Sequence, residues 1–132
     1  MRFDFNNFKK IHLVGIGGSG LSSLARFFLS KNIQVSGSDS SDSKTLQELK
    51  NLGVKIFIGH IAGNLPKNTE CLIYTIAANQ NNPEITLAKK KNIPIFSYPE
   101  TLGMISENLF TIAISGAHGK TTTTNMIGKI LM

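Results

Sequence analysis

The chain has 132 residues, is 41% hydrophobic and carries 14 Lys and Arg against 8 Asp and Glu, which gives a formal net charge of +6. This length suits a single domain of ordinary size, and the apolar fraction excludes a disordered tail or linker. The single cysteine, Cys71, cannot form an intrachain disulfide, which argues against a stapled secreted module. No apolar run approaches the roughly 18–20 residues of a membrane span, and the first residues do not follow the order of a signal peptide. We therefore expect a soluble cytoplasmic protein that does not associate with membranes.

The positive charge is dispersed along the chain, apart from the pair at residues 9–10 and the triplet at residues 89–91. The triplet falls at the C-terminal end of a predicted helix, where cations interact favourably with the helix dipole. This role is favoured over a nucleic-acid-binding patch, and we expect no nucleic-acid partner.

Short β-type runs alternate with helical patterns, which is typical of an α/β fold with a largely parallel sheet and helices on both faces. The first strand is predicted over residues 10–14, before a glycine cluster, and the following helix ends near Asn32. A second strand covers residues 33–37 and leads to Asp39. A polar loop with an N-cap at residues 40–43 then precedes a helix, and Gly53 stops this helix.

The second half continues the alternation. Strands are predicted at residues 54–58 and 71–74, and Asn82-Pro83-Glu84 is a good helix opening, with a cap, a proline and an acid in the first turn. This helix runs to about Lys91. It is followed by a short strand at residues 95–96 and a short helix from Tyr98 to about Ser106.

The last segment begins a second unit of the same kind. Residues 110–114 have the pattern of a buried strand, and a loop and an apolar helix follow. One strand, a loop and half a helix cannot bury a core. We therefore expect one complete domain over residues 1–107 and the truncated first strand–loop–helix unit of a second α/β domain over residues 108–132.

The first glycine-rich loop, Gly15-Ile16-Gly17-Gly18-Ser19-Gly20, matches G-x-G-x-x-G between a strand and a helix. In this motif Gly15 makes the tight turn, Gly17 lets a pyrophosphate approach the backbone, and Gly20 lets the helix pack closely on a strand. Asp39 follows 19 residues after Gly20, where an acid can accept hydrogen bonds from a ribose. The loop thus predicts a nucleotide diphosphate ligand, and the alternative is a structural glycine turn with Asp39 capping a loop.

The second loop, Gly116-Ala117-His118-Gly119-Lys120-Thr121, also lies between a predicted strand and a helix. It departs from the P-loop template, because Ile114 stands where the template has a glycine five residues before Gly119. It still offers backbone donors, a lysine for β- and γ-phosphates and a hydroxyl for Mg²⁺. This loop predicts a second phosphate site, with His118 shaping the loop or touching phosphate.

The two loops, together with Val35-Ser36-Gly37-Ser38-Asp39 and Asn82-Pro83-Glu84-Ile85, resemble the Mur ligases, the ATP-dependent amide-forming enzymes of peptidoglycan precursor synthesis. These segments occur in family order across nearly the whole chain. The resemblance is closest to the member that joins L-alanine to UDP-N-acetylmuramate. The member that attaches a recycled tripeptide is less well matched at the first glycine loop.

The resemblance implies a Rossmann-like UDP-binding domain, a central ATPase domain and a C-terminal domain that binds the amino acid, the last of which is absent here. It implies that the diphosphate is held by Gly15, Gly17, Gly18, Ser19 and Gly20 and the ribose by Asp39, and that His60, Thr75 and Ala77 lie near the uracil. ATP would be held by Gly116, Ala117, His118, Gly119, Lys120, Thr121 and Thr122. Lys120 and Thr121 would be catalytic, with Thr121 binding Mg²⁺, and the carboxylate would be activated as an acyl phosphate.

The sequence departs from the family at two segments. Ala117 stands where the family usually has threonine, and Thr75-Ile76-Ala77-Ala78 stands where it has Ser-Ser-Ala-Ile. We expect this chain alone to catalyse no reaction, because the amino-acid domain and further ATPase residues are missing.

Two other functions are compatible with the first loop. One is the NAD-binding domain of an oxidoreductase, which leaves Gly119-Lys120-Thr121 unexplained, and the other is a non-catalytic nucleotide sensor. His12 and Cys71 are predicted to be packed side chains. No His, Cys and Asp cluster has the spacing of a metal site, which argues against structural zinc.

Overall fold

The computed structural model describes residues 4–79 and 81–114, with side chains described up to residue 107. Five parallel strands form one sheet in the order β3-β2-β1-β4-β5. The strands are β1 (Lys10–Val14), β2 (Gln34–Asp39), β3 (Lys55–Ile58), β4 (Cys71–Tyr74) and β5 (Ile95–Ser97). The helices are α1 (Ser19–Ser30), α2 (Lys44–Asn51), α3 (Pro83–Lys90) and α4 (Tyr98–Ile114), with short 3-10 turns η1 (Phe5–Asn7) and η2 (Ala62–Asn64).

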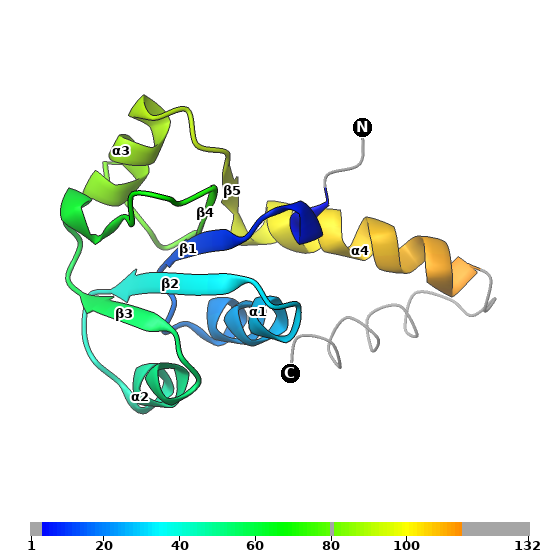
Figure 1. Cartoon of the computed structure of the whole chain (residues 1–132), viewed down its shortest axis with the longest axis horizontal. Coiled ribbons are helices and arrows are strands. Elements are labelled where there is room, and N and C mark those ends of the chain that lie inside the picture. The colour runs from blue at the N-terminus through cyan, green and yellow to red at the C-terminus, as the bar shows by residue number, and fades with distance from the viewer. Residues whose placement is uncertain (1–3, 80, 115–132) are drawn as a thin grey trace.

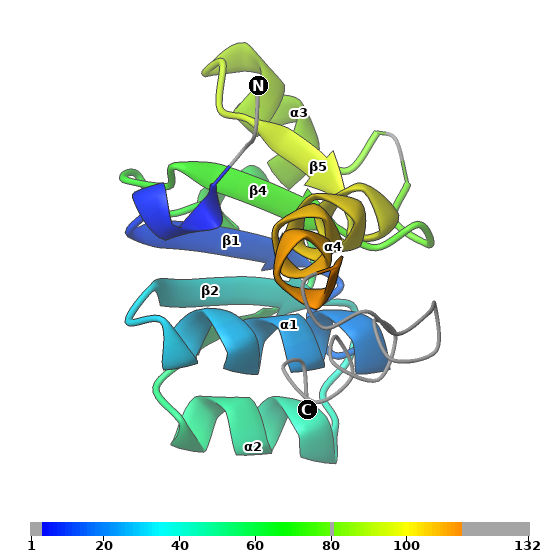
Figure 2. The ribbon, with the colours of Figure 1, turned by 90° about the vertical axis from the view of Figure 1, so that its right-hand side faces the viewer.

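The helices lie on both faces of the sheet, so the predicted α/β architecture is confirmed. Figure 1 shows α1 and α2 on one side of the strands and α3 on the other, and Figure 2 shows α4 on the same side as α1. The larger apolar cluster joins α1, α2 and α4 to the sheet, with Leu24, Phe28 and Leu49 fully buried. A smaller cluster joins α3 to β1 and β4 through Val14, Leu72, Ile85 and Ala88, all buried.

The ends of α1, α2 and α3 follow the signals in the sequence. Ser43 caps α2 by accepting a hydrogen bond from the Leu46 amide, and Asn82 caps α3 in the same way from the amides of Glu84 and Ile85. Asn32 after α1 and Gly53 after α2 adopt left-handed backbone conformations, with φ of 62° and 100°. These local interactions explain why the sequence pattern places the helix boundaries well.

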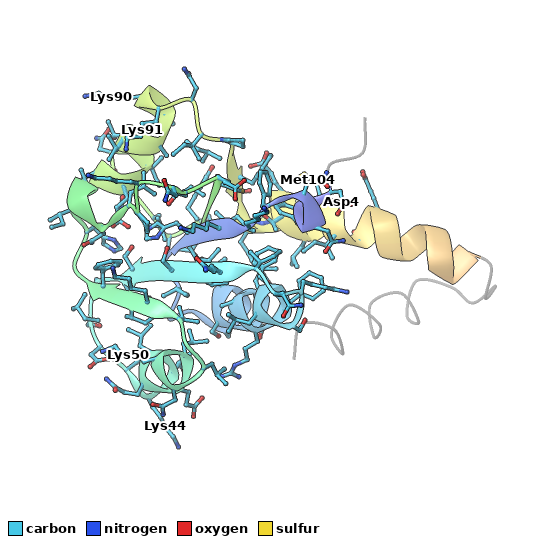
Figure 3. All side chains as sticks on the ribbon, in the orientation of Figure 1. Asp4, Lys44, Lys50, Lys90, Lys91 and Met104 are labelled. Carbon is cyan, nitrogen blue, oxygen red and sulfur yellow. The ribbon has the colours of Figure 1, made fainter. Side chains whose placement is uncertain are left out.

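The lysine triplet lies where it was predicted, at the C-terminal end of α3. Lys89 and Lys90 occupy the last turn of this helix and Lys91 is its C-cap residue. Figure 3 shows Lys90 and Lys91 at the outer end of the helix. All three lysines are exposed, as expected for cations that interact with helix carbonyls.

The prediction of a strand at residues 110–114 is wrong, because α4 continues from Tyr98 to Ile114 instead of ending near Ser106. A strand needs a neighbour to pair its backbone groups, and within residues 4–79 and 81–114 the sheet holds only the five strands named above. A helix satisfies the same groups internally, and Figure 1 shows α4 projecting away from the sheet. The helix therefore runs through the predicted domain boundary at residues 107 and 108.

No helix in the described part of the chain is long and apolar enough to cross a membrane.

Candidate functional site

A pocket of about 380 Å³ opens at the carboxyl edge of the sheet. The order of the strands reverses between β1 and β4, and in open α/β sheets this switch point is where ligands bind. Three connections meet there: the loop after β1, the end of β2 with its polar loop, and the segment after β4. The pocket is lined by Gly15, Gly17, Gly18, Asp39, Ser41, Ser43, Thr75 and Ala77.

The loop after β1 is held by the end of β2. The amides of Gly15 and Ile16 both donate to the Ser38 carbonyl, at 2.8 and 3.1 Å. Gly15 has a φ of +87°, as expected for the tight turn, and a side chain there would overlap the Thr75 methyl group. The glycine therefore allows the loop to lie directly against the end of β4.

Asp39 extends from β2 to the glycine loop. Its Oδ2 accepts a hydrogen bond from the Gly17 amide at 2.8 Å, and its Oδ1 accepts one from the Ser40 amide at 2.8 Å. A methyl group on Gly17 would come within 2.7 Å of Oδ2, so the absent side chain gives the carboxylate room. Oδ1 also accepts a long hydrogen bond from Ser40 Oγ at 3.5 Å, whereas Oδ2 can accept a second bond, which leaves Asp39 able to receive a ligand hydroxyl.

The donors left for an anion lie in the first turn of α1. The amides of residues 15–18 are each bonded within the protein, to Ser38, Asp39 or Gly15. The first intrahelical bond of α1 comes from Ser22 to the Gly18 carbonyl. The amides of Ser19, Gly20 and Leu21 therefore have no acceptor in the preceding turn, and together with the positive end of the helix they suit a phosphate group.

Gly20 serves a packing contact other than the one predicted. A methyl group there would come within 2.5 Å of the Tyr98 ring, which is at the start of α4. The small residue therefore allows α1 and α4 to approach closely, whereas the motif predicted an approach between α1 and a strand.

A buried polar cluster lies on the other face of the sheet, under α3. Its centre is Glu84, whose Oε1 accepts hydrogen bonds from His12 Nε2 at 2.6 Å and from Ser38 Oγ at 2.7 Å. The other oxygen, Oε2, is 3.0 Å from His60 Nδ1. His12 Nδ1 is in turn 2.8 Å from Ser36 Oγ. Three segments of the chain, β1, β2 and the turn after β3, thus converge on one carboxylate of α3 that has no exposed surface.

The cluster keeps Glu84 ionised. Burial alone would raise the pKa of this carboxyl, but the hydrogen bonds from His12, Ser38 and His60 together outweigh burial and hold the pKa below its usual range. The N-terminal turn of α3, where Glu84 lies, further favours a negative charge.

The comparisons with known proteins agree with this geometry. The family model described as "Mur ligase family, catalytic domain" matches residues 10–109. The chain belongs to the Mur ligase family. A UDP-N-acetylmuramate–L-alanine ligase of Clostridium tetani is 46% identical over 132 residues, which is 98% of this chain and 29% of the relative. The chain therefore spans less than a third of the length of that relative.

Solved structures of Mur ligases share the fold. The crystal structure of UDP-N-acetylmuramate–alanine ligase from Thermotoga maritima is 34% identical, with a TM-score of 0.69 over 77% of this chain and 23% of that one. A UDP-N-acetylmuramate:L-alanyl-γ-D-glutamyl-meso-diaminopimelate ligase from Neisseria has 26% identity and a TM-score of 0.66, over 76% and 31% of the two chains. With these relatives, the oxidoreductase interpretation is the weaker one.

The structure brings together most of the residues predicted to hold the UDP group. Six of them line the pocket: Gly15, Gly17, Gly18, Asp39, Thr75 and Ala77. Ser19 and Gly20 contribute first-turn amides beside it. His60 is not among the lining residues, because its ring nitrogen is bonded to Glu84 and lies 3.2 Å from Ser38 Oγ.

Sequence reasoning missed Ser41, Ser43 and the role of Glu84. The two serines belong to the polar run after β2, which indicated a loop and a helix cap but not a pocket wall. Glu84 was interpreted only as an acid in the first turn of a helix. Its partners come from distant segments, and no local pattern connects them.

The remaining candidates divide into buried side chains and positions outside the described residues. His12 and Cys71 are fully buried, as predicted, and burial raises the pKa of the Cys71 thiol to about 12. The proposed ATP and Mg²⁺ site, Gly116, Ala117, His118, Gly119, Lys120, Thr121 and Thr122, lies outside the described residues. Among the described side chains, no group of three His, Cys, Asp or Glu residues is placed to hold a metal ion.

Proposed function

We propose that this chain is the substrate-binding part of an ATP-dependent ligase that joins L-alanine to UDP-N-acetylmuramate. Residues 1–107 form the UDP-binding domain and residues 108–132 begin the ATPase domain of the cytoplasmic enzyme. The observation that carries the proposal is the pocket at the switch point, where Asp39 and the first-turn amides of α1 lie on adjacent segments. The relatives from Clostridium tetani and Thermotoga maritima, whose names state that they are UDP-N-acetylmuramate–alanine ligases, give the proposal its substrates.

The pocket offers a separate set of contacts to each part of the nucleotide. The amides of Ser19, Gly20 and Leu21 bind the diphosphate, because they are unpaired and lie at the positive end of α1. Asp39 accepts hydrogen bonds from the ribose hydroxyls with the lone pairs that Gly17 and Ser40 leave free. Thr75 and Ala77, after β4, line the part of the pocket that receives the uracil.

The second half of the reaction belongs to the ATPase domain. Lys120 and Thr121 would bind the phosphates of ATP and Mg²⁺. Transfer of the γ-phosphoryl group from ATP to the muramyl carboxylate would give an acyl phosphate and ADP, and attack by the alanine amine would then release inorganic phosphate. We expect the 132-residue chain by itself to turn over no ATP, because it spans only 29% of the length of a related ligase. Phosphate release above that of a Lys120→Ala variant would contradict this part of the proposal.

Calorimetric titration with UDP-N-acetylmuramate and, separately, with NAD tests the ligand. We expect heat of binding from the UDP-sugar and none from NAD. Binding of NAD alone would overturn the proposal and favour an oxidoreductase domain.

Asp39→Ala tests the site within the same experiment, and we expect it to weaken binding of UDP-N-acetylmuramate by about tenfold or more, the effect of losing charged hydrogen bonds. Asp42→Ala is the matched control. Asp42 lies in the polar loop after β2, and its side chain accepts a hydrogen bond from the Ser43 amide at 2.8 Å, just as the Asp39 side chain accepts one from the Ser40 amide. Unlike Asp39, Asp42 does not line the pocket. Equal dissociation constants for Asp39→Ala and the wild type would remove Asp39 from the site.

A further inference from the structure

Ser38, at the carboxyl end of β2, contacts both the glycine loop and the buried cluster under α3. Its carbonyl accepts the Gly15 and Ile16 amides, which fixes the glycine loop beside the pocket. Its hydroxyl points to the face of the sheet that α3 covers and donates a hydrogen bond to Glu84 Oε1 at 2.7 Å. The residue is fully buried, and the next residue is Asp39. Any displacement of Ser38 would therefore move both the glycine loop and the pocket carboxylate.

Glu84 holds Ser38 from a distance of 46 residues in the sequence. The same carboxylate accepts hydrogen bonds from His12 in β1 and from His60 in the turn after β3. Together with the bond from Ser38, these contacts link β1, β2 and the turn after β3. The Asn82 side chain fixes the Glu84 amide at 2.9 Å, which sets where the first turn of α3 begins. The turn after β3 is also bonded to the pocket residue, because the Gly59 amide donates to the Asp39 carbonyl at 2.7 Å.

We propose that Glu84 is a positioning residue of the nucleotide pocket, which acts through Ser38 and touches no ligand. The inference deepens the proposed function and rests on it for the identity of the ligand. A buried carboxylate that accepts three hydrogen bonds has a single well-defined position, and removal of the carboxylate leaves buried donors without a partner. The pocket geometry at the carboxyl edge of the sheet is thus set by an ion on the face under α3.

The test compares Glu84→Ala and Glu84→Gln with the control Glu100→Ala in the complete 132-residue chain. Glu100 is also a first-turn glutamate that accepts a hydrogen bond, from the Ser97 amide at 2.9 Å, but it is exposed and lies at α4. Two quantities are measured: the hydrogen-exchange rates of the Gly15 and Ile16 amides by NMR, and the dissociation constant of UDP by calorimetry. The Val54 amide, which donates to the Leu49 carbonyl at 3.1 Å under α2, serves as the reference for general loosening.

We expect Glu84→Ala to speed exchange at Gly15 and Ile16 by about tenfold relative to Val54, and to weaken UDP binding by about tenfold. Glu84→Gln should remain within about threefold of the wild type, because the amide oxygen can still accept from Ser38 and His12 while its nitrogen donates to His60. The control variant should change neither quantity. Rescue by glutamine separates positioning from a general loss of stability, which would raise exchange at Val54 as well.

Unchanged exchange at Gly15 and Ile16 in a folded Glu84→Ala variant would overturn the inference, as would equal acceleration at Val54. If Glu84→Ala does not fold, Ser38→Ala replaces it, because this change removes the hydroxyl and keeps the carbonyl. The same exchange pattern is then expected, and its absence is equally decisive. A wild-type chain that binds no UDP would contradict the proposed function, whereas the exchange rates would still decide whether Glu84 positions the loop.

Discussion

Strands β1 and β2 present an apolar face to α1 and α2 and a polar face to α3. Ile11, Leu13 and Val35 pack in the larger core on the first face. On the second face His12 and Ser38 bond Glu84, and Ser36 bonds His12. Both faces are buried, yet they depend on different physics. Apolar packing tolerates exchanges of similar volume, whereas a buried carboxylate needs each of its donors in place. The comparison suggests that the first face mainly supplies stability and the second mainly supplies geometry.

The largest effect is expected from a cavity on the apolar face. Leu24 in α1 is fully buried, so Leu24→Ala should lower the free energy of unfolding by about 2–5 kcal/mol. Urea denaturation measures the change. Leu52→Ala is the control, because Leu52 is 54% exposed and its truncation should cost less than about 0.5 kcal/mol. Similar losses in the two variants would mean that this face is not the stabilising core.

The polar face should show a strong dependence on the type of substitution. Glu84→Ala removes the acceptor of three buried or partly buried donors and should cost about 2–3 kcal/mol, whereas Glu84→Gln should cost about 1 kcal/mol. The two unfolding free energies, measured in urea, are compared with that of Glu100→Ala at the exposed start of α4. A glutamine variant as unstable as the alanine variant would show that charge, rather than geometry, dominates this face.

The difference between the two faces also explains what the sequence could predict. The spacing of Leu21, Leu24 and Phe28 is that of one helix face, and this face of α1 is buried. The predicted caps near residue 43 and at Asn82 located the starts of α2 and α3. These signals are local, because a helix face or a cap involves residues a few positions apart. The polar cluster has no such signal, since His12, Ser38 and Glu84 become neighbours only through the strand order.

The glycine loop was predicted in part, unlike the helix signals, which were predicted well, and the polar cluster, which was not predicted. The motif and Asp39 predicted a site at the end of the first two strands, and the structure brings them together in one pocket. The motif did not predict that Asp39 would bond the Gly17 amide, or that Gly20 would make room for Tyr98. Those contacts depend on packing between distant elements. The strand expected at residues 110–114 failed for a related reason, because a strand pattern indicates burial but not an available neighbour.

A change of pH should alter the stability that the polar face contributes and leave the contribution of the apolar face unchanged. The folded-state pKa of Glu84 lies below its ordinary value of 4.5, so its stabilising contribution is present above pH 4.5 and is lost as the pH falls through the lower, folded-state value. The stability difference between the wild type and Glu84→Gln should therefore shrink in acid. Urea denaturation at pH values from about 7 to about 3 measures it. The difference between the wild type and Leu24→Ala should not follow this trend.

The smallest expected effect is a coupling energy, and it tests whether the polar face acts as one unit. Ser36 is linked to Glu84 through His12, whose Nδ1 lies 2.8 Å from Ser36 Oγ and whose Nε2 lies 2.6 Å from Glu84 Oε1. Ser36→Ala and Glu84→Gln should therefore be non-additive by about 0.5–1 kcal/mol in a double-mutant cycle of unfolding free energies. Leu24→Ala and Glu84→Gln act on opposite faces and should add within about 0.5 kcal/mol. Additivity in both cycles would mean that the imidazole of His12 does not transmit changes between its two partners, and that Glu84 affects Ser38 without involving the rest of the cluster.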